Sequence, residues 1–184
     1  KASGIDFNAR FATNIGGGDF VAQAHATRNV SMLYQASEDS DLEDYLGLLG
    51  YHGTTGGPKW VGNFDLRYTT PNDRLTFRYG IEYTGKMDSQ DALQPDPVPY
   101  RGTTVVSDQV AEAYIEHAVS IRYNWPEVAS LTLGVNNLFD EKPPVIGSYG
   151  TGGSNRRPTI GNYFNYGTYD FLGRSVFLNV TRSF

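Results

Sequence analysis

Ionisable side chains recur at alternate positions in several short segments of this sequence, and their chemistry decides which functions are open. Such groups can exchange protons, bind metal ions, pair with one another or line a polar path. The spacing of every second residue places each group on one side of an extended chain. We interpret these side chains as lining the inside of a barrel, where they pair with one another or border a solute path: Asp6, Arg10, His25, Asp65, Arg67, Arg78, Glu82, Glu116 and Arg122.

Catalytic and metal-binding motifs are the alternatives to that interpretation, and the spacing favours none of them. His25, His52 and His117 lack the four-residue helical spacing of a zinc site, and no Gly-x-Ser-x-Gly nucleophile elbow occurs. The glycines at 16–18 lack the Lys-Ser or Lys-Thr of a phosphate-binding loop, and the chain has no Cys. We therefore expect no enzyme, no metal and no cofactor.

The acidic segment 38–44, with sequence Glu-Asp-Ser-Asp-Leu-Glu-Asp, has oxygen ligands that would suit calcium. It lacks the glycine and the twelve-residue spacing of an EF-hand, which favours a solvated surface loop.

Composition narrows the class of protein further. The chain has 184 residues, a net charge of −5 and 39% hydrophobic residues, with 13 Tyr and 10 Phe. An acidic balance argues against a nucleic-acid partner, because binding phosphates needs clustered Lys and Arg. No apolar run reaches the length of about 18 residues that a transmembrane helix requires, but transmembrane strands with alternating faces have a modest hydropathy of this kind.

Period-two alternation of apolar and polar residues predicts extended strands along the whole chain. In Leu75–Tyr83, leucine, isoleucine and aromatic residues alternate with Thr76, Arg78, Gly80 and Glu82. The aromatic residues of such segments are interpreted as lipid-contacting and girdle residues: Trp60, Phe64, Tyr68, Phe77, Tyr79, Tyr83 and Tyr123. His117 falls on the same face and conflicts with this interpretation unless it lies at the membrane interface. The pattern predicts seven strands, near residues 5–15, 20–30, 60–68, 75–83, 115–123, 131–135 and 174–184.

The connections between these strands alternate in length. Short turns are expected near 16–19, 70–73 and 124–127, and long segments occupy about 32–58, 85–111 and 140–173. Outer-membrane barrels combine short periplasmic turns with long extracellular loops in this way. Because bacterial barrels have even strand numbers and open sheet edges are costly in lipid, seven strands predict a part of a larger barrel.

Two stretches near the C-terminus resemble a known family. Leu131–Lys142 contains Gly-Val-Asn-Asn-Leu-Phe-Asp, which is similar to the penultimate barrel strand of TonB-dependent outer-membrane receptors. Tyr169-Asp170-Phe171-Leu172-Gly173-Arg174, followed by an alternating strand with an aromatic end, resembles the last strand of that family. The start at Lys1–Asp6 is similar to a strand start in such receptors.

The resemblance implies that residues 1–184 are the last strands of a 22-stranded antiparallel transmembrane β-barrel, whose plug domain and earlier strands lie outside this sequence. It implies an active-transport receptor in the bacterial outer membrane that imports a scarce ligand, such as a siderophore, cobalamin or carbohydrate. The implied partners are the rest of the barrel and the plug, the TonB complex acting through the missing N-terminal part, outer-membrane lipid and the barrel-assembly machinery.

The resemblance also assigns roles to residues near the end of the chain. Terminal Phe184 resembles the signal for barrel assembly, and a simple girdle residue is the alternative. The last long loop is where substrate contacts are expected, since Tyr and Arg supply stacking and anion contacts, and packing within the loop is the alternative. Its candidate residues are Tyr149, Arg156, Arg157, Tyr163, Phe164, Tyr166 and Tyr169.

Two rival hypotheses remain at the level of sequence. If Tyr163–Asp170 formed an eighth membrane strand, the chain could close alone as a small barrel with a structural or adhesive role. An outer-membrane lipase or protease is the second rival, supported only by scattered His and Asp residues.

Overall fold

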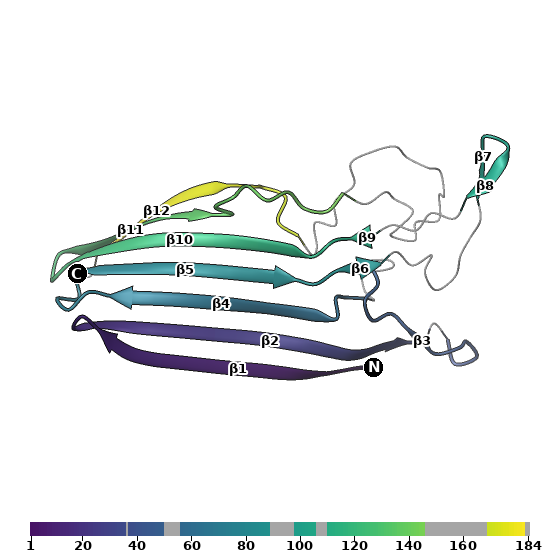
Figure 1. Ribbon diagram of the computed structural model, residues 1–184, viewed down its shortest axis with the longest axis horizontal. Coiled ribbons are helices and arrows are strands. Elements are labelled where there is room, and N and C mark those ends of the chain that lie inside the picture. Colours follow the sequence, from purple (N-terminus) through teal and green to yellow (C-terminus); the bar gives the residue numbers. More distant parts are fainter. Residues whose placement is uncertain (36, 50–55, 89–97, 106–109, 146–168, 183–184) are drawn as a thin grey trace.

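The computed structural model describes residues 1–35, 37–49, 56–88, 98–105, 110–145 and 169–182, and its strands are antiparallel. The seven strands predicted from the sequence form one sheet in chain order (Figure 1). No helix in the described part of the chain is long and apolar enough to cross a membrane. The seven strands are β1 (Ala2–Ile15), β2 (Gly18–Tyr34), β4 (Trp60–Thr69), β5 (Leu75–Thr84), β10 (Tyr114–Trp125), β11 (Ala129–Asn136) and β12 (Ser175–Thr181).

Short turns join these strands at one end of the sheet, on the left in Figure 1, and the long connections lie at the other end. Gly16 and Gly17 have φ of 59° and 82° and form the two-residue turn between β1 and β2, a geometry that glycine adopts without strain. Asp73 and Glu127 have positive φ in the turns before β5 and β11. The predicted asymmetry of turns and loops is confirmed for the described strands. We call these two ends of the sheet the turn end and the loop end.

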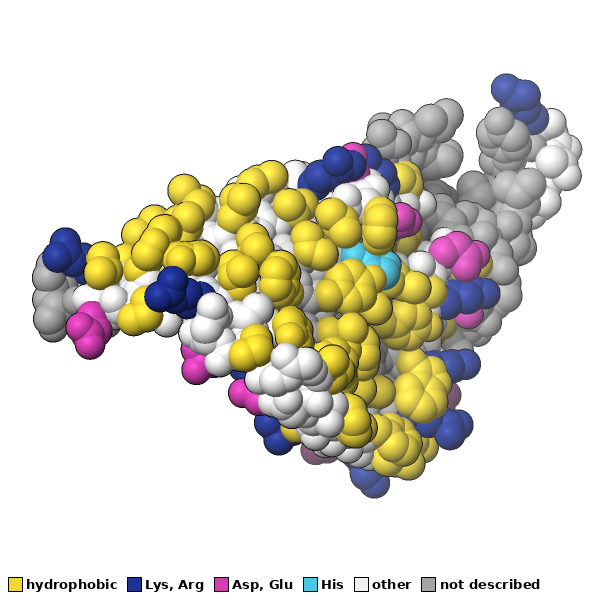
Figure 2. All heavy atoms as spheres, turned by 60° about the vertical axis from the view of Figure 1, so that its left-hand side comes forward, with side chains coloured by type: hydrophobic (Ala, Val, Ile, Leu, Met, Phe, Trp, Pro, Cys, Tyr) yellow, Lys and Arg dark blue, Asp and Glu magenta, His cyan; other side chains and the backbone are white. Residues whose placement is uncertain are grey.

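The register of the sheet separates polar from apolar side chains across all seven strands. Asp65 lies opposite Gly80 and Gly80 opposite Ala118, so residues of one face stay on that face from strand to strand. On the other face, large apolar side chains remain open to the surroundings: Phe11 is 59% exposed, Leu133 47% and Val176 68%. Hydrophobic side chains gather in a broad area in Figure 2. We call the two surfaces the polar face and the apolar face.

Five short strands within the long connections were not predicted. They are β3 (Glu43–Asp44), β6 (Met87–Asp88), β7 (Val98–Tyr100), β8 (Thr103–Val105) and β9 (Val110–Ala111). Strand β3 extends the pairing of β2, while β6 pairs with β9 and β7 with β8. They are too short for an alternating pattern to show in sequence.

The buried hydrophobic cluster lies at the loop end, where three long connections meet the first residue of β10. Two of these connections are joined directly, because the Leu49 amide donates to the Asp88 carbonyl at 2.8 Å and the Asp88 amide to the Gly47 carbonyl at 2.8 Å. Apolar burial here fixes the bases of the connections relative to the strand ends. We call this cluster the loop core, and its members are Leu49, Met87, Ala111, Tyr114 and Tyr169.

Phe177 is an apolar residue on the polar face, where it lies opposite Gly134. A side chain at Gly134 would overlap the Phe177 ring and lie 3.0 Å from Cβ of Ser120. Gly80 lies on the same face but has room, since its nearest neighbours to an added Cβ are at 3.8 and 4.0 Å. The glycine at 134 therefore allows an aromatic ring to cover the backbone of β11.

We predict that Gly134→Ala destabilises the folded chain by about 1–3 kcal/mol through overpacking. The measurement is the urea unfolding midpoint of the whole protein in detergent. Gly80→Ala is the matched control and should leave the midpoint unchanged, and adding Phe177→Ala should recover much of the loss. Equal effects of the two alanine variants would contradict this account.

Candidate functional site

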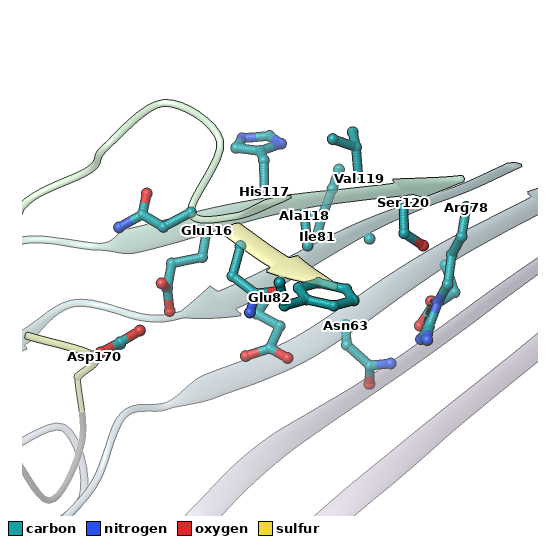
Figure 3. A pocket seen from close by; sticks show the side chains of 15 residues that line it. Asn63, Arg78, Ile81, Glu82, Glu116, His117, Ala118, Val119, Ser120 and Asp170 are labelled. Atoms are coloured by element: carbon teal, nitrogen blue, oxygen red, sulfur yellow. Dashed lines mark hydrogen bonds and ion pairs between the residues drawn. The ribbon is translucent and has the colours of Figure 1, made fainter. Parts of the chain in front are cut away.

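A hollow of about 440 Å³ opens on the polar face near the loop end. Its lining comes from β4, β5, β10, β11 and β12, together with Asp170, which precedes β12. Figure 3 shows Glu82 and Glu116 projecting to the same side of the sheet with Asp170 beside them. His117 and Val119 project to the opposite side in the same view.

Small side chains form the floor of the hollow. Gly80 on β5 lies opposite Ala118 on β10, and Ser120 lies opposite Gly134 on β11. The ring of Phe177 adds an apolar wall from β12. Charged side chains in these two rows and in the neighbouring row therefore stand above a low floor.

An ion pair borders the hollow toward the turn end. The Arg78 guanidinium on β5 contacts the Asp65 carboxylate on β4, with side chains that are 62% and 24% exposed. Arg67 lies directly opposite Arg78, so the pair neutralises one of two adjacent guanidinium groups. Arg122, one row nearer the turns, donates to the Ser130 hydroxyl at 3.1 Å.

Three carboxylates border the hollow toward the loop end. Glu82 and Glu116 are direct cross-strand partners, and Asp170 completes the group. No Lys or Arg among the described residues forms a salt bridge with any of the three. Like charges placed directly opposite on a sheet are destabilising, so this arrangement favours a partner that carries positive charge.

The predicted inward-facing residues share the polar face in the structure. The hollow gathers Asp65, Arg78, Glu82 and Glu116. The other members of the set lie on the same face outside the lining of the hollow: Asp6, Arg10, His25, Arg67 and Arg122. His25 pairs with the Asn8 side chain, and Thr27 donates to Asp6 at 2.6 Å, so β1 and β2 carry their own polar pairs.

His117 lies on the apolar face, as its position in the sequence predicts. The Tyr79 hydroxyl lies 2.6 Å from its Nδ1, and the ring of Phe139 meets the imidazole edge-on at a centroid distance of 4.9 Å. The hydrogen bond supplies the polar partner that a histidine on an apolar surface needs. A histidine on the apolar face conflicts with the pattern of the sequence, and Tyr79 and Phe139 supply the contacts that accommodate it there.

The two stretches that resemble a receptor family meet in space just beyond the hollow. Asp140 accepts the Arg174 backbone N–H at 3.0 Å and the Lys142 ammonium at 2.9 Å. Gly173 has φ of 72°, and a Cβ there would lie 2.9 Å from the Asp140 carboxylate. Buried Asn137 closes the segment by exchanging two hydrogen bonds with the backbone of Glu141. We call this the clasp, made by residues 137–142 and 173–174.

The contacts of the clasp lower the pKa of Asp140. The Arg174 amide and the Lys142 ammonium hold the pKa of Asp140 below its ordinary value, because both favour the ionised carboxylate. The resemblance to a receptor family drew attention to these residues but gave no reason for their types. Their contact across a long connection could not be read from spacing.

Tyr169 is described by the structure as a member of the loop core. It is 4% exposed and packs edge-on against Tyr114, with ring centroids 5.4 Å apart. Burial raises the pKa of Tyr169 to about 12. Its place in the core makes it a support for the loop base, and the other candidate ligand residues, at 149, 156, 157, 163, 164 and 166, lie outside the described residues, as does Phe184.

The acidic segment 38–44 ends in a structural contact. The Asp44 carboxylate accepts the amides of Met32 at 2.9 Å and Leu46 at 3.1 Å. Within the described ranges, no group of three or more His, Cys, Asp or Glu side chains is arranged to hold a metal ion.

Comparison of the chain with protein-family models, with curated proteins and with solved structures finds no match. The geometry therefore carries the functional argument. It presents a two-faced sheet with a polar hollow that an ion pair borders toward the turn end and three carboxylates border toward the loop end.

We predict that Asp140→Asn loosens the clasp at neutral pH, seen as faster amide hydrogen exchange at Arg174 and along β12. Because the pKa of Asp140 is lower in the folded chain than its value of about 3.9 in the unfolded chain, the ionised carboxylate stabilises the fold at pH values above 3.9. This stabilisation is lost as the pH falls through the lowered pKa of the folded state. Native chain and variant should thus converge in strong acid. Glu141→Gln is the control, and a variant that exchanges no faster than this control at pH 7 would refute the assignment.

Proposed function

We propose that this chain is a sector of a transmembrane β-barrel in the bacterial outer membrane, with its apolar face toward lipid and its polar face toward the lumen. The single observation that carries the proposal is the separation of faces across seven antiparallel strands whose turns and long connections lie at opposite ends. Contiguous exposed apolar surface of this extent is unusual on a soluble monomer, and lipid contact accounts for it.

Side chains at the loop end of the apolar face suit a membrane interface. The ring of Trp60 stacks on Phe7 at 6.0 Å, and the Arg28 guanidinium lies 5.8 Å from its ring centroid. Aromatic and long basic side chains favour the headgroup region, where an apolar body and a polar tip are both accommodated.

Strand direction supports a barrel larger than the seven described strands. β1 and β12 form the two edges of the sheet and run in the same direction, so pairing them directly would be parallel. β1 has 14 residues and β12 has 7, which would leave half of β1 unpaired. Since open edges are costly in hydrocarbon, we propose additional strands between them.

The proposed class is a TonB-dependent transporter that binds a scarce ligand outside the cell and imports it with energy from the inner membrane. The clasp supports this proposal, because its two halves are the two stretches that resemble that family. In this hypothesis the clasp fixes both ends of the last long connection above the lumen. Ligand binding and gating, and not catalysis, would be the activity.

Single cysteines test the proposal cleanly, because the sequence contains none. We predict that Leu133→Cys and Ile121→Cys on the apolar face resist a water-soluble maleimide in outer-membrane vesicles, because a thiol in hydrocarbon does not ionise to the reactive thiolate. The neighbouring positions are the matched controls: Thr132→Cys and Ser120→Cys on the polar face should react with the same reagent. These pairs differ by one residue along a strand and therefore by the face they occupy.

Reaction of all four cysteines with the water-soluble reagent, or recovery of the protein outside the outer-membrane fraction, would overturn the barrel. Insertion without energy-dependent ligand uptake would retain the barrel and overturn the transporter.

A further inference from the structure

Arg28 interrupts an otherwise uncharged face of the sheet. The register places it on the apolar face, directly opposite Ile5 on β1 and Trp60 on β4. Within the bounds of the seven long strands, no other Asp, Glu, Lys or Arg lies on this face. Arginine is costly against hydrocarbon and tolerated near the interface, so its position along the strand decides what it can do.

The position of Arg28 is the border of the apolar band at the loop end. Strand β4 begins at Trp60, so this row is the last that β2 and β4 share. The next positions on this face of the β1–β2 pair are Ser3 and Ser31, whose hydroxyl oxygens lie 2.7 Å apart. Arg28 therefore stands where apolar side chains give way to polar ones, at the depth of lipid headgroups in the proposed barrel.

The guanidinium of Arg28 has no acidic partner in the described part of the chain. None of the salt bridges there includes Arg28. Asp6 lies on the polar face, where it accepts the Thr27 hydroxyl at 2.6 Å. The contact that Arg28 does make is with the ring of Trp60, 5.8 Å from the ring centroid. An aromatic ring contacts the flat face of a guanidinium and leaves its N–H donors available to an anion.

Toward the turns, short side chains follow Arg28 on the same face of β2, and aromatic side chains flank them. The short residues are Ala22, Ala24 and Ala26, and the aromatic residues opposite them are Phe7 and Phe11 on β1 and Phe64 on β4. Phe7 and Phe11 are exposed. An acyl chain laid along β2 would contact rings on both sides, with its headgroup beside the guanidinium.

We propose that Arg28 binds the phosphate group of a lipid headgroup in the membrane leaflet at the loop end, with Trp60 beside the headgroup and an acyl chain along β2. Contact with hydrocarbon, which the proposed function already entails, requires no charged side chain. A phosphate does, because a guanidinium offers it two parallel hydrogen bonds. The inference rests on the proposed function for the membrane and adds a specific site within it.

The test compares two forms of one lipid on the whole protein in detergent. The probes are fluorescent diphosphorylated lipid A and the same lipid after removal of its phosphates, with binding followed by fluorescence anisotropy. We expect the phosphorylated form to bind about tenfold more tightly, with the difference reduced at high salt. An excess of inorganic phosphate should not displace the lipid, because a free anion lacks the acyl chain.

Substitutions at Arg28 locate the site. Arg28→Gln should lower the affinity for phosphorylated lipid A about tenfold, to that of the dephosphorylated form. Arg28→Lys should restore part of the loss, because it retains the charge without the paired donors. Arg10→Gln makes the same change in charge on the polar face of the adjoining strand and should leave binding unchanged. Cysteine labelling at positions 132 and 133 in each variant confirms that the barrel is inserted.

Equal binding of the two lipid forms, or equal loss in Arg28→Gln and Arg10→Gln, would overturn the proposal. Displacement by inorganic phosphate would also overturn it, in favour of a site for the free anion. Any of these results with normal cysteine protection would leave the barrel standing, whereas loss of protection in the native protein would remove the barrel and this site with it.

Discussion

Cross-strand register is the constraint on which the rest of this structure depends. The side chains of a strand alternate with a period of two, so a slip of one residue between any two strands would move charged groups onto the apolar face. The turn glycines Gly16 and Gly17 and the left-handed residues Asp73 and Glu127 fix that register at one end of each hairpin. The polar hollow and the apolar surface are both consequences of the same alignment.

The loop end shows a different kind of stability. Strand residues pack on few neighbours and leave large apolar groups exposed, whereas Leu49, Met87 and Tyr169 are buried where the connections meet. The loop core and the clasp therefore anchor the bases of the long connections independently of the surroundings of the sheet. Such an arrangement allows a surface to vary in its outer loops while the strand ends below remain fixed.

Sequence reasoning succeeded where structure is set locally and failed where it is set by distant contacts. The alternation in Leu75–Tyr83 and its counterparts predicted every long strand and its two faces, because periodicity is a property of neighbouring residues. The contact between Asp140 and Arg174 joins the two ends of a long connection, the contact between Gly134 and Phe177 joins two strands, and neither has a local signal. The hollow was missed for the same reason, although its charged strand residues had been assigned to the correct face; Asp170 had been assigned to no face.

A pair of like charges on the polar face destabilises the sheet, and no Lys or Arg among the described residues forms a salt bridge with it. Glu82 and Glu116 lie directly opposite each other, and placing an Arg in this row would relieve the repulsion, yet the arginines of the face lie elsewhere. Local conflicts of this kind are expected at functional sites, where binding a partner compensates the loss. Gly80 and Ala118 form the adjoining row and leave the hollow open beside the two carboxylates, so a partner that carries positive charge can reach them.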